Sequence, residues 1–209
     1  PNLAQHTSNC NKAAESRHKL TMKVLIVSTY DVVGGAARAA HRLHDAFNES
    51  GIDCTLRVLA KGGDSPTVEA RRTFRELFAI RIVNRFIGNN LKKLLKSSNK
   101  NLRSLAISGS GLVDEINRSD ADVVNLHWVN HEMFSIKDFS RISKPLVWTL
   151  HDMWAFCGAE HVCGDEENAR WRIGYHKQNR PVGDTGLDLD RWVWKRKKLN
   201  WTKPIQMVV

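Results

Sequence analysis

Two histidines follow directly after apolar, strand-like runs of this chain. His127 comes after residues 122–126, and His151 with Asp152 comes after residues 146–150. An imidazole can donate or accept a hydrogen bond and can transfer a proton near neutral pH. Because ligands of parallel sheets bind beyond the carboxyl ends of the strands, we expect these side chains to border one crevice.

The side chains around these histidines leave alternatives open. His127 could be a hydrogen-bonded core residue beside Trp128, and His151 with Asp152 could close a strand or form a general acid–base unit. Trp154 follows in the same loop, and its aromatic face could stack on a sugar ring. The position at the strand end favours a site role for His151.

Adjacent glycines stand where an early strand turns into a helix. Gly34 and Gly35 follow the run 23–29 and lead into the helical pattern of residues 36–49. Such a turn lets the backbone approach a ligand, and the N–H groups of a helix start favour an anion. The loop lacks both the GxGxxG order and the GK[ST] ending, which disfavours a dinucleotide or ATP site. The glycines could also simply allow a tight turn.

Strand and helix patterns alternate along the chain, which predicts the fold class. Parallel strands joined by helices form an α/β, doubly wound parallel sheet of the Rossmann-like kind. Residues 159–190 show no clear period and are expected to form a long loop beside the crevice. The sequence predicts strands at residues 23–29, 54–60, 122–126, 146–150 and 204–209, and helices at 36–49, 112–118, 136–142 and 189–201.

Most of the net charge of +10 is concentrated in one segment of the chain. Residues 71–100 hold nine basic residues and one acidic residue, Glu76, with apolar side chains at helical spacing. This pattern predicts a basic amphipathic helix whose apolar stripe packs on the sheet and whose charges contact an anionic membrane surface. No helix-turn-helix, RRM or zinc-finger pattern supports a nucleic-acid partner.

The N-terminal residues indicate the domain organisation, and the cysteines indicate the cellular compartment. Residues 1–21 are polar and precede Met22, so we expect a disordered, upstream or cloning-derived leader and a single domain over residues 22–209. No apolar stretch reaches the roughly 18–20 residues of a membrane span. Four scattered cysteines indicate a reducing, cytoplasmic location. Cys157, His161 and Cys163 fit no standard zinc motif, so no metal is predicted.

Four segments together resemble a known enzyme family. In order they are VGGAARAAHRLHDAF, ADVVNLHWVN, SKPLVWTLHDMWAFCG and DRWVWKRKKLNW. The chain is similar to the N-terminal domain of family 4 (group 1) glycosyltransferases of GT-B fold, of the type that builds bacterial exopolysaccharide, colanic acid and O-antigen. The resemblance covers residues 22–209 and implies transfer of a sugar, with retention, from a nucleotide-sugar substrate to a glycan or lipid-linked acceptor, without a cofactor.

The resemblance also implies roles for individual residues. Gly34 and Gly35 would approach the donor diphosphate, and His151 would be catalytic, contacting the transferred sugar and helping to organise the transition state. The acceptor pocket would be shaped by His127, Asp152 and Trp154.

The E-x7-E motif and the phosphate-binding Lys or Arg of that family belong to a C-terminal domain that this sequence lacks. We therefore expect the isolated chain to be inactive. The basic residues 71–100 further predict a peripheral location on the inner face of the cytoplasmic membrane. The alternative function is a noncatalytic module that binds a carbohydrate or an anionic lipid.

Overall fold

A single parallel sheet organises the part of the protein that the computed structural model describes, which is residues 22–70, 82, 90, 94–97 and 99–209. The six strands are β1 (Lys23–Tyr30), β2 (Asp53–Ala60), β3 (Val68–Ala70), β5 (Val123–Leu126), β6 (Leu146–Thr149) and β8 (Gln206–Val208). Their order is β3-β2-β1-β5-β6-β8, and every neighbouring pair is parallel.

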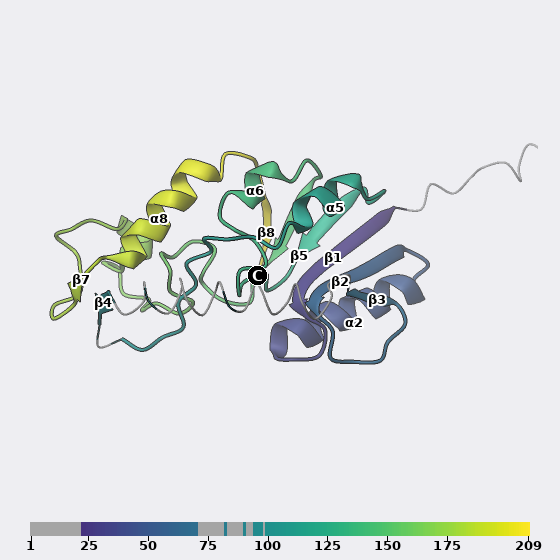
Figure 1. Ribbon diagram of the computed structural model, residues 1–209, viewed down its shortest axis with the longest axis horizontal. Helices are drawn as coiled ribbons and strands as arrows, with labels where there is room; N and C mark the ends of the chain where they lie inside the picture. Colours follow the sequence, from purple (N-terminus) through teal and green to yellow (C-terminus); the bar gives the residue numbers. More distant parts are fainter. Residues whose placement is uncertain (1–21, 71–81, 83–89, 91–93, 98) are drawn as a thin grey trace, which may run out of the picture.

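Helices and a small second sheet complete the described part of the chain (Figure 1). The helices are α2 (Gly35–Glu49), α5 (Leu112–Arg118), α6 (Asp138–Arg141), α7 (Arg170–Ile173) and α8 (Leu189–Asn200). The second sheet pairs β4 (Leu95–Lys96) with β7 (Thr185–Gly186) in antiparallel orientation. None of the helices within the described ranges is long and apolar enough to cross a membrane.

The central strand β1 is buried on both faces, because its side chains alternate between two apolar clusters. Val24 and Ile26 belong to one cluster together with Ala40 of α2, whereas Leu25 and Val27 belong to the other. Burial of a side chain of this size stabilises the fold by about 1.5–3 kcal/mol. The continuous apolar run of β1 thus reflects helices on both sides of the sheet.

The larger apolar cluster, which contains the second set of β1 side chains, also takes in α5, α6 and α8. Their apolar side chains share this cluster with strands β5 and β6; they are Leu112, Val113, Ile116, Phe139, Leu189 and Val193, and Ile142 follows directly after α6. With α2 on the opposite face, this arrangement confirms the α/β, Rossmann-like doubly wound fold predicted from the sequence.

Short elements were missed by the sequence patterns. Strand β3 pairs with β2 beyond the loop 61–67, and its Glu69 carboxylate accepts a hydrogen bond from the Arg57 side chain at 2.8 Å. The segment 159–190, expected to be a loop, contains α7 and β7. The helix expected at 136–142 is limited to α6. Elements of two to four residues carry too few side chains to show a period.

The predicted basic helix lies mostly outside the described residues. Where the chain is described at the end of that segment, Leu95 and Lys96 form β4 and pair with Gly186 and Thr185, so the helical prediction is wrong for these two residues. Leu95 also packs against the larger apolar cluster. Apolar spacing had favoured a helix, but backbone pairing with a distant segment determines the local structure. The predicted leader, residues 1–21, also lies outside the described residues.

Candidate functional site

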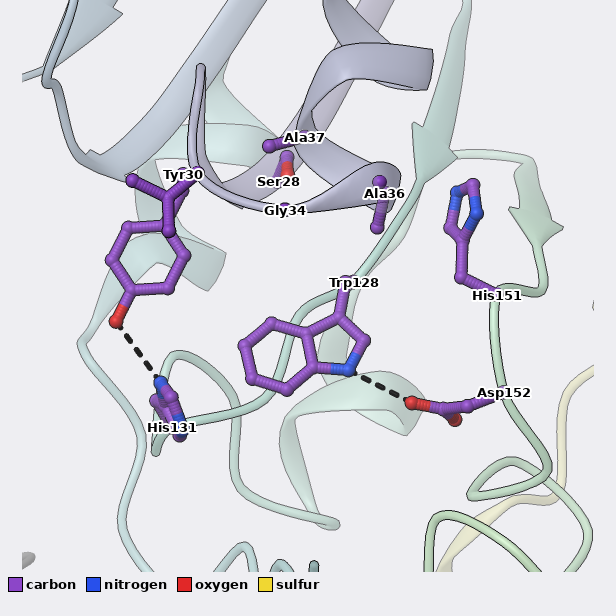
Figure 2. Close-up of a pocket in the computed structure, with 11 residues that line it drawn as sticks. Ser28, Tyr30, Gly34, Ala36, Ala37, Trp128, His131, His151 and Asp152 are labelled. Carbon is purple, nitrogen blue, oxygen red and sulfur yellow. Dashed lines mark hydrogen bonds between the residues drawn. The ribbon is translucent and has the colours of Figure 1, made fainter.

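A pocket of about 500 Å³ opens at the carboxyl ends of the central strands (Figure 2). Strand β1 contributes its last residues, α2 contributes its first turn, and the loops after β5 and β6 contribute polar and aromatic side chains. The lining residues are Ser28, Tyr30, Val33, Gly34, Gly35, Ala36, Ala37, Trp128, His131, His151 and Asp152.

The topology of the sheet accounts for the place of this pocket. Strand β1 lies between β2 and β5, so the chain crosses to one side of β1 first and to the other side later. Loops after β1 and β5 therefore leave the sheet in opposite directions and open a crevice between them. The sequence-based expectation that the glycine turn and His151 border one crevice is met, since Gly34, Gly35 and His151 all line this pocket.

The glycine turn opens helix α2 toward the pocket. Gly34 has a φ of 89° and a ψ of 171°, a conformation that is essentially restricted to glycine. A Cβ atom added at Gly35 would meet no atom within 4 Å, so this position borders open space. No side chain of the described residues caps α2, and its first turn carries no acidic residue. The helix start thus offers free N–H groups and a positive dipole end to an anion.

Asp31 holds the loop after β1 in place from a fully buried position. Its two carboxylate oxygens accept hydrogen bonds from the backbone N–H groups of Gly62 at 2.8 Å and Gly63 at 2.9 Å. Burial raises the pKa of Asp31, but these backbone hydrogen bonds outweigh it and bring the pKa below its ordinary value. The carboxylate is therefore charged at neutral pH and links the ends of β1 and β2. Sequence reasoning did not single out this residue.

His151 and His127 form a pair of stacked imidazoles at the edge of the sheet. The Nδ1 atom of His127 lies 2.8 Å from Nε2 of His151, and the ring centroids are 5.0 Å apart. His151 is exposed and lines the pocket, whereas His127 is buried behind it. The structure therefore places His127 as a support for His151 and not on the pocket wall, which corrects its predicted direct contact with the acceptor.

Both histidines are neutral at neutral pH. Burial, with a smaller contribution from His151, lowers the pKa of His127 to about 4. Burial also lowers the pKa of His151, although the nearby Asp152 carboxylate acts in the opposite direction. With Nε2 in contact with His127, a neutral His151 has Nδ1 left for one hydrogen bond to a ligand, so it suits a hydroxyl group better than it suits charge neutralisation.

Asp152 lines the pocket while both of its oxygens bind protein groups. Oδ2 accepts from Trp128 Nε1 at 2.8 Å and contacts His161 Nδ1 at 2.6 Å, and Oδ1 accepts from the Trp154 N–H at 2.9 Å. Burial raises the pKa of Asp152, but hydrogen bonds led by the one to His161 outweigh it and lower the pKa overall. Asp152 therefore fixes the indole of Trp128 beside the pocket.

An aromatic wall faces the glycine turn, and sequence reasoning did not assign it to the site. The rings of Tyr30 and Trp128 have centroids 6.4 Å apart with an interplanar angle of 20°, and the Tyr30 hydroxyl lies 3.0 Å from His131 Nδ1.

A backbone bend positions His131 beside these rings, because His131 and Glu132 adopt positive φ values of 55° and 60°. The Glu132 carboxylate fixes this bend by accepting hydrogen bonds from the N–H groups of residues 107 and 108. In the sequence, only the position of residues 127–131 (HWVNH), directly after a predicted strand, indicated that these side chains could border a site.

Trp154 lies in the core, not in the pocket, which corrects the expectation that it shapes the acceptor site. The residue is 1 % exposed, and its indole N–H donates to the Ser104 carbonyl at 3.0 Å. Its ring packs against Trp148 and Trp201, and the Lys197 ammonium lies 3.7 Å from the ring centroid. The turn after β6 directs this side chain inward, so a ligand cannot stack on it.

One group of side chains could hold a metal ion. Among the residues that the structure describes, His41, His44 and Asp45 on α2 bring three ligand atoms within 4.8 Å of one another. This group lies outside the residues that line the pocket. Cys157 and Cys163 are adjacent, but His161 uses its ring nitrogens to contact Asp152 and Ser104.

Comparisons of the chain with protein-family profiles, with curated proteins and with solved structures returned no match. A proposal about function therefore rests on the geometry of the pocket and on the sequence motifs around it.

Proposed function

We propose that this chain is the acceptor-side, N-terminal part of a nucleotide-sugar-dependent glycosyltransferase of GT-B fold that acts in cell-surface polysaccharide synthesis. The observation that carries the proposal is the shared pocket of the glycine turn and His151. They belong to two of the four segments that carry the family resemblance. They are separated by more than a hundred residues in the sequence, and the fold brings them to the same cavity.

The first turn of α2 supplies the anion-binding part of the proposed site. Gly34 and Gly35 leave the backbone accessible, and the helix dipole adds a partial positive charge at this end. We assign the diphosphate of the nucleotide-sugar to this position. The formal negative charge of the pocket lining comes from Asp152 alone, which is already hydrogen-bonded to protein groups.

The opposite wall suits a sugar. His151 offers a neutral imidazole that can donate a hydrogen bond to a hydroxyl group of the transferred sugar. Trp128 and Tyr30 present apolar ring surface of the kind that packs on the C–H faces of a pyranose. In the reaction, an acceptor hydroxyl oxygen forms a bond to the anomeric carbon while the bond to the diphosphate oxygen breaks, and the nucleoside diphosphate leaves and takes up the hydroxyl proton. We assign no nucleophile to this chain.

Ligand-detected NMR can test this assignment, because saturation transfer reports weak binding to the isolated chain. We expect uridine- or guanosine-diphosphate sugars to receive saturation, strongest on sugar protons, and their ³¹P signals to broaden. Gly35→Leu places a side chain in the open space of the pocket and should abolish both effects. Ala46→Leu adds an apolar side chain at an exposed position near the other end of α2 and should leave them unchanged.

The same experiment tests the location of the site and separates the transferase from the alternative function, a noncatalytic binding module. Equal binding by the Gly35→Leu variant would place the ligand elsewhere and refute the site. Saturation of a free oligosaccharide or of a short-chain anionic lipid, with none on any nucleotide-sugar, would instead favour the noncatalytic binding module.

Membrane contact by residues 71–100 is a separate proposal that rests on their charge. Nine basic residues against Glu76 would attract an anionic surface. Sedimentation should carry the protein down with phosphatidylglycerol vesicles at low salt and leave it in solution with phosphatidylcholine vesicles. Equal sedimentation with both lipids, or with neither, would contradict the proposal.

A further inference from the structure

Two thiols lie in contact at the ends of a short loop outside the pocket. Sγ of Cys157 and Sγ of Cys163 are 2.8 Å apart, and both cysteines are free. Cys157 is fully buried, whereas Cys163 is partly exposed. Six positions separate them in the sequence, so the pair closes a small loop that contains Gly158, Glu160 and His161.

The backbone of this loop is held from several sides, which keeps the thiols together. The Lys197 ammonium donates to the carbonyls of Trp154, Cys157 and Gly158. The Gly158 N–H donates to the Tyr175 hydroxyl at 2.7 Å. A Cβ atom at Gly158 would lie 2.4 Å from the Asp190 carbonyl oxygen, so the loop is pressed against the start of α8.

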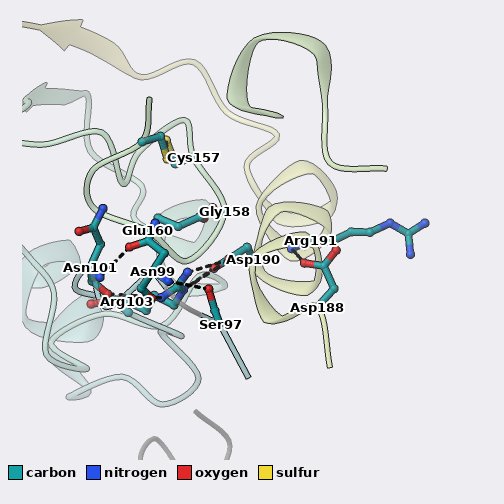
Figure 3. A network of polar contacts seen from close by, with 12 residues as sticks. Ser97, Asn99, Asn101, Arg103, Cys157, Gly158, Glu160, Asp188, Asp190 and Arg191 are labelled. Carbon is teal, nitrogen blue, oxygen red and sulfur yellow. Dashed lines mark hydrogen bonds and ion pairs between the residues drawn. The ribbon is translucent and has the colours of Figure 1, made fainter. Parts of the chain in front are cut away.

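A buried ion pair reinforces the same region (Figure 3). Arg103 Nε donates to Asp190 Oδ1 at 3.0 Å, and both side chains are less than a tenth exposed. Glu160 lies beside them, and burial, with the Asp190 charge as the second cause, raises its pKa to about 8. The loop is thus part of a rigid polar network, so little chain entropy remains to be lost when the two sulfurs are joined.

The two thiols differ in reactivity. The hydrogen bond between the two thiols lowers the pKa of Cys163, and the same contact, with burial, raises the pKa of Cys157. Cys163 is also the more accessible of the two. An accessible thiol with a lowered pKa is the attacking group in thiol–disulfide exchange, and a buried neighbour resolves the product.

The loop is connected to the pocket through a chain of contacts. His161 lies between the cysteines in sequence, and its Nδ1 is 2.6 Å from Asp152 Oδ2. The same oxygen accepts from Trp128 Nε1, and both Asp152 and Trp128 line the pocket. A covalent change in the loop can therefore alter the position of the Trp128 ring.

We propose that Cys157 and Cys163 form a dithiol–disulfide site that reacts with a low-molecular-weight disulfide of the glutathione class. The Cys163 thiolate attacks one sulfur of glutathione disulfide, forming a mixed disulfide and releasing one glutathione thiolate. The Cys157 thiol then loses its proton to solvent, and its sulfur attacks Sγ of Cys163 and expels the second glutathione. The protein dithiol is oxidised by two electrons, and one glutathione disulfide is reduced to two thiols. This proposal does not depend on the glycosyltransferase assignment.

Redox titration with peptide mapping tests the site. The purified chain is equilibrated in buffers of graded reduced and oxidised glutathione, quenched with iodoacetamide and digested. We expect one two-electron transition that ends in a disulfide between Cys157 and Cys163. Cys157→Ser should instead trap a stable glutathione adduct on Cys163. Cys54→Ser should titrate like the parent chain, since burial raises the pKa of Cys54 to about 11 and keeps it unreactive.

Several results would overturn the proposal. Independent alkylation of the two cysteines at every glutathione ratio would show that they do not react as a pair. A disulfide to Cys10 or Cys54 would assign the chemistry to another pair, and release of stoichiometric zinc from the purified protein would assign the thiols to a metal.

A separate NMR measurement tests the connection between the cysteine loop and the pocket. In protein labelled with ¹⁵N-tryptophan, the indole resonance of Trp128, assigned with Trp128→Phe, should shift on oxidation of the parent chain and stay fixed in Cys157→Ser. An unchanged resonance in the oxidised parent chain would refute the connection.

Discussion

The buried imidazole of His127 contacts the exposed imidazole of His151 at 2.8 Å, so a core residue fixes the orientation of a residue on the pocket wall. The other ring nitrogen of His127, Nε2, is buried without a hydrogen-bond partner among the described residues. A buried ring in this setting resists protonation, because a second N–H would have no acceptor.

We predict that the protein loses stability in mild acid through His127. Its pKa is about 4 in the folded chain and near 6.5 in the unfolded chain, so the unfolded chain binds the proton first. The free energy of unfolding should therefore fall as the pH drops through this window, by on the order of 2 kcal/mol between about pH 7 and about pH 5. Urea unfolding at a series of pH values measures this.

Two histidine variants make the pH test specific. His127→Gln removes the titrating group, so its stability should vary less with pH than that of the parent chain. His176→Gln removes an exposed histidine and should keep the parent slope. Identical slopes for the parent chain and His127→Gln would contradict the assignment.

Removal of His151 should weaken ligand binding while the fold is retained. The side chain is exposed, but its Nε2 contacts Nδ1 of the buried His127, so His151→Ala should keep the chain folded with a modestly lower urea midpoint. Loss of one hydrogen bond to the sugar should weaken nucleotide-sugar binding by roughly ten-fold, measured by NMR titration. His176→Ala is the matched control outside the pocket. Unaltered affinity in His151→Ala would remove this residue from the site.

Two tryptophans should respond in opposite ways to substitution. Trp154→Ala empties a core position and should cost about 3–5 kcal/mol of stability. Trp128→Ala removes a pocket wall and should mainly reduce sugar binding. Thermal unfolding and NMR titration of both variants separate the two effects. If Trp154→Ala unfolded like the parent chain but lost ligand affinity, its placement in the core would be wrong.

Asp31→Asn should destabilise the loop contact between the ends of β1 and β2. An asparagine amide offers one acceptor oxygen where Gly62 and Gly63 present two N–H donors, so one donor would face an NH₂ group. We expect a loss of about 1–3 kcal/mol in urea unfolding. Asp64→Asn makes the same charge change at an exposed position of the neighbouring loop and should be nearly neutral. Equal effects of both substitutions would contradict the role of Asp31.

The sequence by itself determined the layered fold and the edge of the sheet that carries the pocket. Continuous apolar runs such as that of β1 specify strands buried on both faces, and alternation with helices specifies parallel order. The Gly34–Gly35 pair was also readable, because the backbone at Gly34 requires a conformation that other residues avoid. These features are local, so their cause lies within a few neighbouring residues.

Only the tertiary structure decided which strand-end side chains face the pocket. Trp154 points into the core because Lys197, Trp148 and Trp201 pack around it, and two of these partners come from the distant C-terminal segment. The contact between Cys157 and Cys163 likewise depends on a loop held by α8. The spacing of apolar residues in the sequence indicates whether a segment is extended or helical. The direction of a side chain in a turn is set instead by packing partners that are far away in the sequence.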